Sequence, residues 1–225
     1  MPVLRLGMPP DGRFSKPRIW AIFTRVNEPD PVPDLQTSSD HELMRLVAAG
    51  RREALAVLVH RHQAKMLALA YRFLGRWEAA EDVCQDAFIR VLEAAKDYQP
   101  TAALTTWLYR VVANLCWDRR RRAAREPAQL PTDIEAMRGG ASGQGSGEQN
   151  ERETRIRDAV AQLPDRQRLV LVLHRYSELS YKEIEEITGW SSGAVESCIV
   201  RAYGRLRELL ADLGREGEER GKDEG

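Results

Sequence analysis

The side chains able to carry acid–base, nucleophilic or metal chemistry are few and scattered in this sequence. His60 and His62 stand two residues apart, so on a helix they face different sides and do not form a metal-binding pair. Asp82 and Asp86 are one helical turn apart and could act as acid and base, but no pocket is indicated around them. No glycine-rich phosphate loop follows a strand. The pattern therefore predicts no catalytic residue, no metal site and no cofactor, and leaves an enzyme as the weakest interpretation.

Charge is segregated along the chain, although the formal net charge of its 225 residues is zero. Residues 77–97 are mostly acidic among their charged positions, whereas residues 104–125 end in the basic run DRRRRAAR. One uniform polyanion cannot attract both surfaces, so the simplest interpretation has a protein partner on the acidic face and phosphate backbone on the basic one. Two solvated faces are the plainer alternative. The acidic residues are Glu78, Glu81, Asp82, Asp86, Glu93 and Asp97, and the basic ones are Arg119, Arg120, Arg121, Arg122 and Arg125.

Aromatic side chains are interleaved with this basic run. Trp107, Tyr109 and Trp117 lie on or beside the basic helix, and Tyr98 lies in the loop before it. Unstacked bases of single-stranded nucleic acid need an aromatic surface for the base and cations for the backbone. Trp107 shares a helical face with Val111 and is expected to lie partly in the core, while Trp117 suits either role. This composition favours a surface for single-stranded nucleic acid.

A helix-turn-helix is predicted at residues 180–210. Ser180 and Glu183 have the spacing of a capping box, and Gly189 can take the left-handed conformation that a tight turn requires. Ser191 or Ser192 then caps a second helix that reaches about residue 210. The apolar residues spaced to form a small core between the two helices are Ile184, Ile187, Val195 and Ile199. A short helix, a glycine turn and a longer helix form the geometry that places a helix in the major groove, and an ordinary helical hairpin is the alternative.

The elements that must position these residues are helices, because no stretch alternates as a strand does. The apolar spacing of residues 39–125 predicts five helices, of which the first begins at a capping box formed by Ser39 and Glu42. The third ends at Gly75, the fourth covers about 77–95 and the fifth begins near residue 104. Helical order resumes near residue 151, and Pro164 begins a further helix. The predicted fold class is all-α, with two small helical domains.

Composition divides the chain further. Residues 1–38 hold seven of the eleven prolines and are expected to be a leader without order. A flexible linker is predicted at 126–150, where five glycines fall between residues 139 and 147, so the domains would span 39–125 and 151–213, with a charged tail at 214–225. The three cysteines form no CxxC pair, and no apolar run approaches the roughly 20 residues of a membrane helix. A soluble protein of the reducing cytoplasm is expected.

Three segments resemble, in order and spacing, the two conserved domains of extracytoplasmic-function (ECF) sigma factors, a branch of the sigma-70 family. They read AEDVCQDAFIRVLEA, TTWLYRVVANLCWDRRRR and LPDRQRLVLVLHRYSELSYKEIEEITGWSSGAVES. The resemblance covers about residues 40–125 and 151–210. It implies a sigma region 2 bundle and a region 4 helix-turn-helix, in a dissociable subunit that binds core RNA polymerase and directs promoter-specific transcription initiation. It also implies control by an anti-sigma factor.

The resemblance assigns roles to residues at matching positions. The acidic helix would dock on the clamp of the β′ subunit of RNA polymerase, and the β flap would be a further contact. The first domain would recognise and melt the −10 element, and the second domain would bind the −35 element. The polymerase-binding residues would be Asp82, Gln85, Asp86 and Phe88. The −10 residues would be Tyr98, Trp107, Arg110, Asn114, Trp117, Arg119, Arg120, Arg121 and Arg122. The −35 residues would be Ser191, Ser192, Glu196, Ser197, Val200, Arg201 and Arg205.

The second domain departs from the family pattern at several positions. The recognition helix of the family usually reads T-V-[KR]-S-R-x-x-R-A-R, and here Ala194, Glu196, Cys198 and Tyr203 replace the threonine, the first basic residue, the next arginine and the last one. Glu185 stands where a small residue is usual. A carboxylate facing phosphate lowers affinity, although glutamate can accept a hydrogen bond from cytosine N4. Recognition of the −35 element is therefore expected to be weakened or changed in specificity.

Two other functions remain compatible with the sequence. One is a stand-alone helix-turn-helix regulator of duplex DNA with a helical interaction domain in front of it. The other is a degenerate sigma-like protein that acts through protein contacts alone. The acidic face around Asp82 and Asp86 separates the first alternative from a sigma factor, because only a sigma factor needs that face to hold polymerase.

Overall fold

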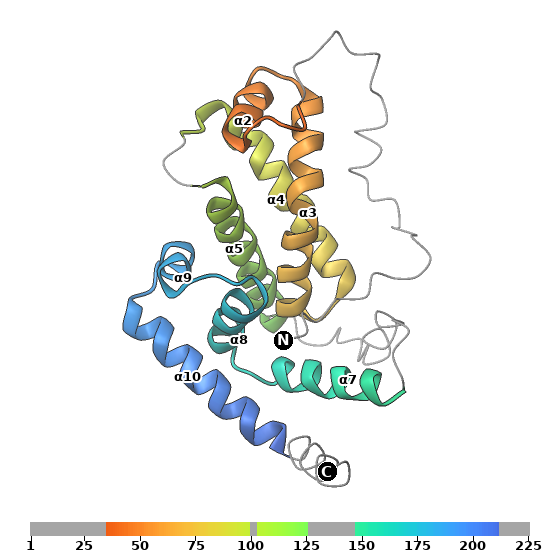
Figure 1. The fold of residues 1–225 in the computed structure, drawn as a ribbon, viewed down its shortest axis with the longest axis vertical. Helices are drawn as coiled ribbons and strands as arrows, with labels where there is room; N and C mark the ends of the chain where they lie inside the picture. Colours follow the sequence, from red (N-terminus) through yellow and green to blue (C-terminus); the bar gives the residue numbers. More distant parts are fainter. Residues whose placement is uncertain (1–34, 100–102, 126–146, 212–225) are drawn as a thin grey trace, which may run out of the picture. The chain divides into compact units, whose positions relative to one another are not determined.

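The computed structural model describes residues 35–99, 103–125 and 147–211, and these residues form helices joined by short turns (Figure 1). No strand occurs in these three ranges, in agreement with the all-α class predicted from the sequence. The chain divides into two compact units, and each is described by itself. The expected leader up to residue 34, the expected linker over 126–146 and the expected tail lie outside the described residues.

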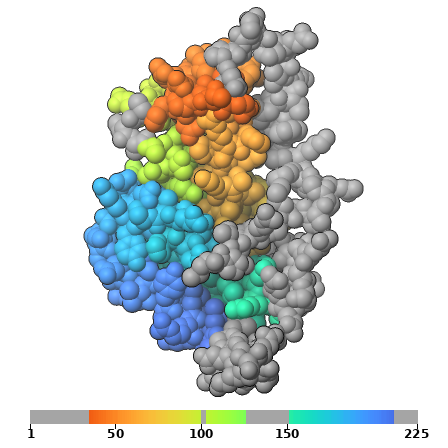
Figure 2. Space-filling view, in the orientation of Figure 1, coloured from red at the N-terminus to blue at the C-terminus, as the bar shows by residue number. Residues whose placement is uncertain are grey.

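The first unit is a bundle built around one long helix. Its elements are α2 (Asp40–Ala48), α3 (Arg52–Leu74), α4 (Trp77–Ala94), the short 3₁₀ turn η1 (Ala95–Asp97) and α5 (Leu104–Arg125). Helix α3 packs against α2, α4 and α5 (Figure 1), and the side chains of α2 and α3 meet on the face seen in Figure 2. The sequence predicted two helices where α3 runs without a break. That prediction was wrong because residues 59–66 contain no glycine or proline to end a helix.

Local signals set the helix ends of this unit as expected. The Ser39 backbone N–H donates to the Glu42 carboxylate at 2.7 Å, and the Glu42 N–H donates back to the Ser39 hydroxyl at 3.3 Å. The Ser39 N–H and the Ser39 hydroxyl, which both donate to the carboxylate, hold the pKa of Glu42 below its usual value. Gly75 ends α3 in the left-handed region at φ 75°, where residues with a Cβ are strained.

One buried polar cluster ties α2 to α3. His62 is buried, and its Nε2 lies 2.8 Å from Oδ2 of Asp40. Arg61 donates to Oδ1 of the same carboxylate at 2.9 Å. The sequence excluded His62 from a metal pair but gave no partner for it, because Asp40 lies 22 residues earlier in the chain. The cluster fixes the first turn of α2 on the bundle.

The second unit contains α7 (Gly147–Ala161), α8 (Asp165–Leu171), the π-helical turn η2 (Val172–Tyr176), α9 (Tyr181–Thr188) and α10 (Ser192–Leu209). Pro164 precedes α8, as predicted. Helix α7 begins at Gly147, so residues 147–150 belong to a helix and not to the predicted linker. The residues after that glycine are Glu, Gln, Asn and Glu, which a helix accommodates more readily than glycine. A small core joins α7, α8 and α10 through Val160, Leu163, Leu171 and Ala202.

A buried arginine caps the end of α7. Arg168 on α8 is 5% exposed, and it donates to the carbonyl oxygens of Val160 at 3.1 Å and Leu163 at 3.0 Å, and to that of Ala161. The last carbonyls of a helix have no partner within the helix, so the guanidinium satisfies groups that would otherwise be buried unpaired. Arg168 therefore joins α7 to α8 by charge-assisted hydrogen bonds, and nothing in the sequence pattern distinguished it from its neighbours.

We expect Arg168→Met to lower the free energy of unfolding of the second unit by about 2–4 kcal/mol, because it leaves several buried carbonyls without a donor. The measurement is denaturant unfolding of the full chain, with hydrogen exchange of the α7 amides to locate the loss. The matched control is Arg175→Met, since Arg175 is exposed in the same unit. Equal effects of the two substitutions would contradict the capping role.

Candidate protein and nucleic-acid interfaces

The exposed face of α4 combines carboxylates with apolar side chains. Asp82 and Asp86 are exposed, and Gln85 is half-buried beside them. Ile89 and Leu92 extend this face at helical spacing, with 44% and 51% of their surface exposed. An apolar centre within a polar rim is typical of protein–protein interfaces. The sequence analysis did not single out Ile89 and Leu92, although their helical spacing from Asp82 and Gln85 places them on the same face.

Phe88 lies on the other side of α4. It is 5% exposed and packs in the core of the first unit, so it supports the helix from beneath and is not part of the exposed face. Of the four residues that the resemblance assigned to polymerase, the structure thus brings Asp82, Gln85 and Asp86 to the surface and places Phe88 inside.

The acidic and basic helices contact each other through an ion pair. The Arg119 guanidinium on α5 donates to the Asp82 carboxylate on α4, and both groups are partly exposed. Within α5, Arg121 donates to Asp118 at 2.6 Å. Two carboxylates therefore balance part of the arginine run, while Arg122, near the end of α5, is exposed. The acidic and basic side chains are thus separated onto two helices, but part of the basic charge is paired with carboxylates.

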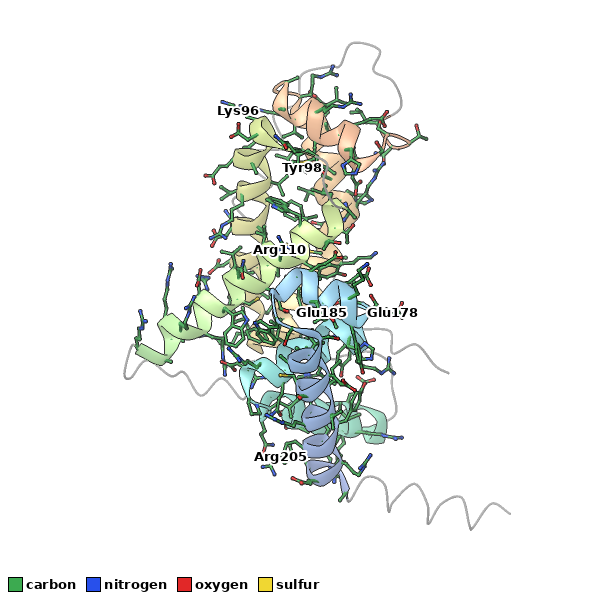
Figure 3. The ribbon with its side chains drawn as sticks, turned by 90° about the vertical axis from the view of Figure 1, so that its left-hand side faces the viewer. Lys96, Tyr98, Arg110, Glu178, Glu185 and Arg205 are labelled. Atoms are coloured by element: carbon green, nitrogen blue, oxygen red, sulfur yellow. The ribbon has the colours of Figure 1, made fainter. Side chains whose placement is uncertain are left out.

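The predicted −10 residues of α5 divide into an exposed and a packed group. Arg110 is exposed (Figure 3), as is Asn114, and Trp107, one turn before Arg110, is half-buried as expected. Trp117 is half-buried too, with its ring centroid 5.7 Å from that of the core residue Phe73. Trp117 therefore has at least one side in the core, whereas Arg110 and Asn114 are exposed.

Tyr98 follows η1 and is held by a residue of α2, which lies far from it in the sequence. Its hydroxyl lies 2.6 Å from Nδ1 of His41 on α2, and the two rings stack with centroids 5.8 Å apart. Burial, followed by the nearby Asp40 carboxylate, raises the pKa of Tyr98. The phenol therefore stays protonated at neutral pH and has a fixed place before α5 (Figure 3).

The helix-turn-helix predicted from the sequence is confirmed. Ser180 and Glu183 form the capping box, with the Ser180 N–H donating to the Glu183 carboxylate at 2.8 Å. Gly189 has φ 71°, and Ser191 occupies the N-cap of α10 with its backbone carbonyl accepting from Val195 at 3.0 Å. The Ser191 hydroxyl makes no capping hydrogen bond, contrary to expectation. The four residues of the predicted core between the helices are all buried: Ile184, Ile187, Val195 and Ile199.

The turn carries a contact that the sequence did not reveal. The Arg166 guanidinium of α8 lies over the Trp190 ring, 5.0 Å from its centroid. Such cation–π contacts are attractive because the ring face is electron-rich. The turn is thereby tied to α8 as well as to the two helices it joins. Glu185, which replaces the usual small residue, is half-buried on α9 (Figure 3).

The exposed face of α10 is mixed in character. Its first half presents Ser192, Glu196 and Ser197 and contains no cation. Val200 follows with 65% of its surface exposed, an unusual position for a β-branched apolar side chain. Exposed arginines lie in the second half, where Arg205 pairs with Glu208 at 2.9 Å (Figure 3). The helix therefore offers side chains suited to base edges first and to phosphates later.

Within the described ranges, no helix is long and apolar enough to cross a bilayer. The same ranges contain no group of three or more His, Cys, Asp and Glu side chains placed to hold a metal ion.

Comparisons with known proteins agree with this arrangement. The family model of sigma-70 region 2 matches residues 58–126, and that of sigma-70 region 4 matches residues 153–206. The RNA polymerase sigma-H factor of Pseudomonas aeruginosa is 29% identical over 191 residues, which are 81% of this chain and 99% of that protein. The ECF RNA polymerase sigma factor SigW of Bacillus subtilis is 32% identical over 180 residues, 76% of this chain and 96% of that protein.

A solved structure is similar as well. CnrH, in complex with the cytosolic domain of CnrY, matches with a TM-score of 0.57 and 28% identity over 78% of this chain and 99% of the CnrH chain. The two matched regions are those of a sigma-70-type transcription factor, in the expected order. The chain belongs to the ECF sigma factors, so it is an alternative sigma factor and not a stand-alone helix-turn-helix regulator.

The three cysteines should differ sharply in reactivity. Cys84 and Cys116 are buried. Burial raises the pKa of the Cys84 thiol to about 12, and it raises the pKa of the Cys116 thiol as well. Because the thiolate is the reactive form, we expect one fast-reacting thiol per native chain with a disulfide reagent near pH 8, at Cys198 on α10. Cys198→Ser should abolish the fast reaction, and unfolding should expose the other thiols. Fast labelling of Cys84 or Cys116 in the native chain would contradict this.

Proposed function

We propose that this protein is a non-catalytic specificity subunit of the cytoplasm that binds core RNA polymerase and the −10 element through its first unit and the −35 element through its second. The observation that carries the proposal is the pairing, within the first unit, of an exposed acidic and apolar face on α4 with a basic and aromatic helix α5. A regulator that bound only duplex DNA would have no use for the α4 face.

Polymerase docking would use the face of α4 around Asp82, Gln85 and Asp86. Ile89 and Leu92 supply apolar surface that becomes buried on binding, and the carboxylates supply orientation toward a basic partner. A surface of this kind fits the clamp of the β′ subunit, while the second unit would contact the β flap. Phe88 would contribute by holding α4 against the core.

Binding of the −10 element would use the opening of α5 and the residue before it. Tyr98 and Trp107 offer ring surface to unstacked bases, and Arg110 and Asn114 offer donors to base edges and backbone. Trp117 and Arg119, which are engaged with Phe73 and Asp82, would hold the helix in place. The arginines that follow, Arg120, Arg121 and Arg122, would lie along the phosphates.

Binding of the −35 element would use the exposed face of α10. The N-terminus of this helix, with Ser191 and Ser192, is suited to a phosphate because its first N–H groups point outward. Glu196 would accept from cytosine N4, and Val200 would contact a thymine methyl. Phosphate and polar contacts would come from Ser197, Arg201 and Arg205.

Control by an anti-sigma factor would act by covering these same surfaces. CnrH, the structural relative, was solved with the cytosolic domain of another protein bound to it. In this chain the α4 face and the exposed side of α10 are the apolar and charged surfaces that a masking protein would need to cover.

The polymerase role is tested with purified full chain and core RNA polymerase, by co-elution and by run-off transcription on genomic fragments. We expect binding and new transcripts with the native sequence, and an affinity for core about 10-fold or more lower for Asp86→Lys, because the substitution reverses a charge in the docking face. The control Gln63→Lys adds a lysine to the exposed side of α3 and should bind normally. Absence of both co-elution and transcripts for the native protein would overturn the proposal.

The promoter role of α10 is tested at Glu196. If its carboxylate reads a base, Glu196→Gln should change the preferred −35 sequence, with a shift of about 10-fold between sites that differ at one position. The measurement is transcription or binding on a library of −35 variants, with Glu151→Gln of α7 as the control. A uniform gain on all sequences would mean that Glu196 only repels phosphate, and unchanged output would exclude both roles.

A further inference from the structure

The contact between His41 and Tyr98 joins two elements that lie far apart in the sequence. His41 is in the first turn of α2, and Tyr98 is the residue that follows η1, 57 positions later. The hydroxyl and Nδ1 are 2.6 Å apart, and the rings are nearly parallel, with an interplanar angle of 27°. The hydrogen bond therefore links two rings that lie in similar planes.

His41 is itself held in place through its neighbour. The Asp40 carboxylate is bound on both oxygens, by Arg61 at 2.9 Å and by His62 at 2.8 Å. Arg61 also donates to the backbone carbonyls of Ser38 at 2.7 Å and Gln36 at 2.5 Å. The chain entering α2 is thus fastened to α3, and His41 has little freedom to follow a movement of Tyr98.

The hydrogen bond is made by a neutral phenol. Burial raises the pKa of Tyr98, so its hydroxyl keeps its proton at neutral pH and can donate to Nδ1 or accept from it, according to the imidazole tautomer. The phenol is only partly buried, so part of Tyr98 stays accessible while its hydroxyl is held by His41. A ring fixed in this way loses less conformational entropy when it stacks on a ligand than a free one would.

We propose that His41 is a positioning residue for promoter opening: it holds the Tyr98 hydroxyl and thereby orients the ring, so that Tyr98 presents a preformed surface to an unstacked base of the −10 element. This inference rests on the proposed role of Tyr98 in −10 binding and adds a residue from α2, which that proposal does not include. A purely structural tie between α2 and η1 is the competing explanation, and the experiment separates the two.

The experiment uses the full chain assembled with core polymerase and a fluorescent single strand carrying the non-template −10 sequence of a promoter that it transcribes. We expect His41→Ala to weaken binding of this strand about 3- to 10-fold while the affinity for core and the unfolding midpoint stay within error. His41→Asn keeps a polar atom near the place of Nδ1 and should recover part of the loss. The control is His60→Ala, because His60 is exposed on α3.

A second arm tests the coupling. Tyr98→Phe removes the hydroxyl and keeps the ring, so its effect should not add to that of His41→Ala in the double variant. Additive effects would overturn the inference, and so would a loss explained entirely by reduced stability or core affinity. If Tyr98→Ala weakens strand binding while His41→Ala does not, the inference fails and the proposed function stands. If Tyr98→Ala binds normally, the assigned role of Tyr98 fails and the inference fails with it.

Discussion

Helix α3 packs against α2, α4 and α5, and the candidate surfaces of the first unit depend on the position it gives to these helices. Phe73 and Leu58 of α3 are fully buried, and the ring of Phe73 contacts Trp117 on α5. At its middle, His62 binds Asp40 at the start of α2. Because apolar packing fixes the inner face of each neighbouring helix, the outer faces of α4 and α5 are left for partners. The candidate surfaces are thus made of side chains that the core does not use.

Those outer faces carry opposite charge on two helices that touch. The ion pair between Asp82 and Arg119 joins them, but both groups are partly exposed and such pairs contribute little to stability. The apolar core, and not this ion pair, therefore holds α4 and α5 together, although water would solvate their charged groups well if they separated. Under the proposed function, this arrangement would let one small unit bind a basic protein surface and a polyanion on adjacent helices, since neither partner would have to displace core contacts.

Local signals in the sequence predicted much of this fold, and long-range contacts account for what it missed. The capping box of Ser180 and Glu183 and the left-handed Gly189 act within a few residues, so spacing alone was sufficient to find the helix-turn-helix. The partner of His62 and the capping role of Arg168 depend on segments brought together by folding. Motif matching assigned Phe88 to an interface, but burial is decided by the register of the whole bundle.

The two units differ in where their cationic side chains lie, and this difference suggests different contributions to DNA binding. Phosphate contacts supply affinity without sequence information, and base contacts supply specificity. Arginines are concentrated on α5, whereas the first half of α10 presents Glu196 and, further along, the exposed Val200 in place of cations. In the proposed function, a helix of this composition would bind weakly alone, but the first unit is on the same chain and would raise its effective concentration at the promoter once polymerase is bound. The second unit would then select among sequences by base contacts that are too weak to hold it on DNA unaided.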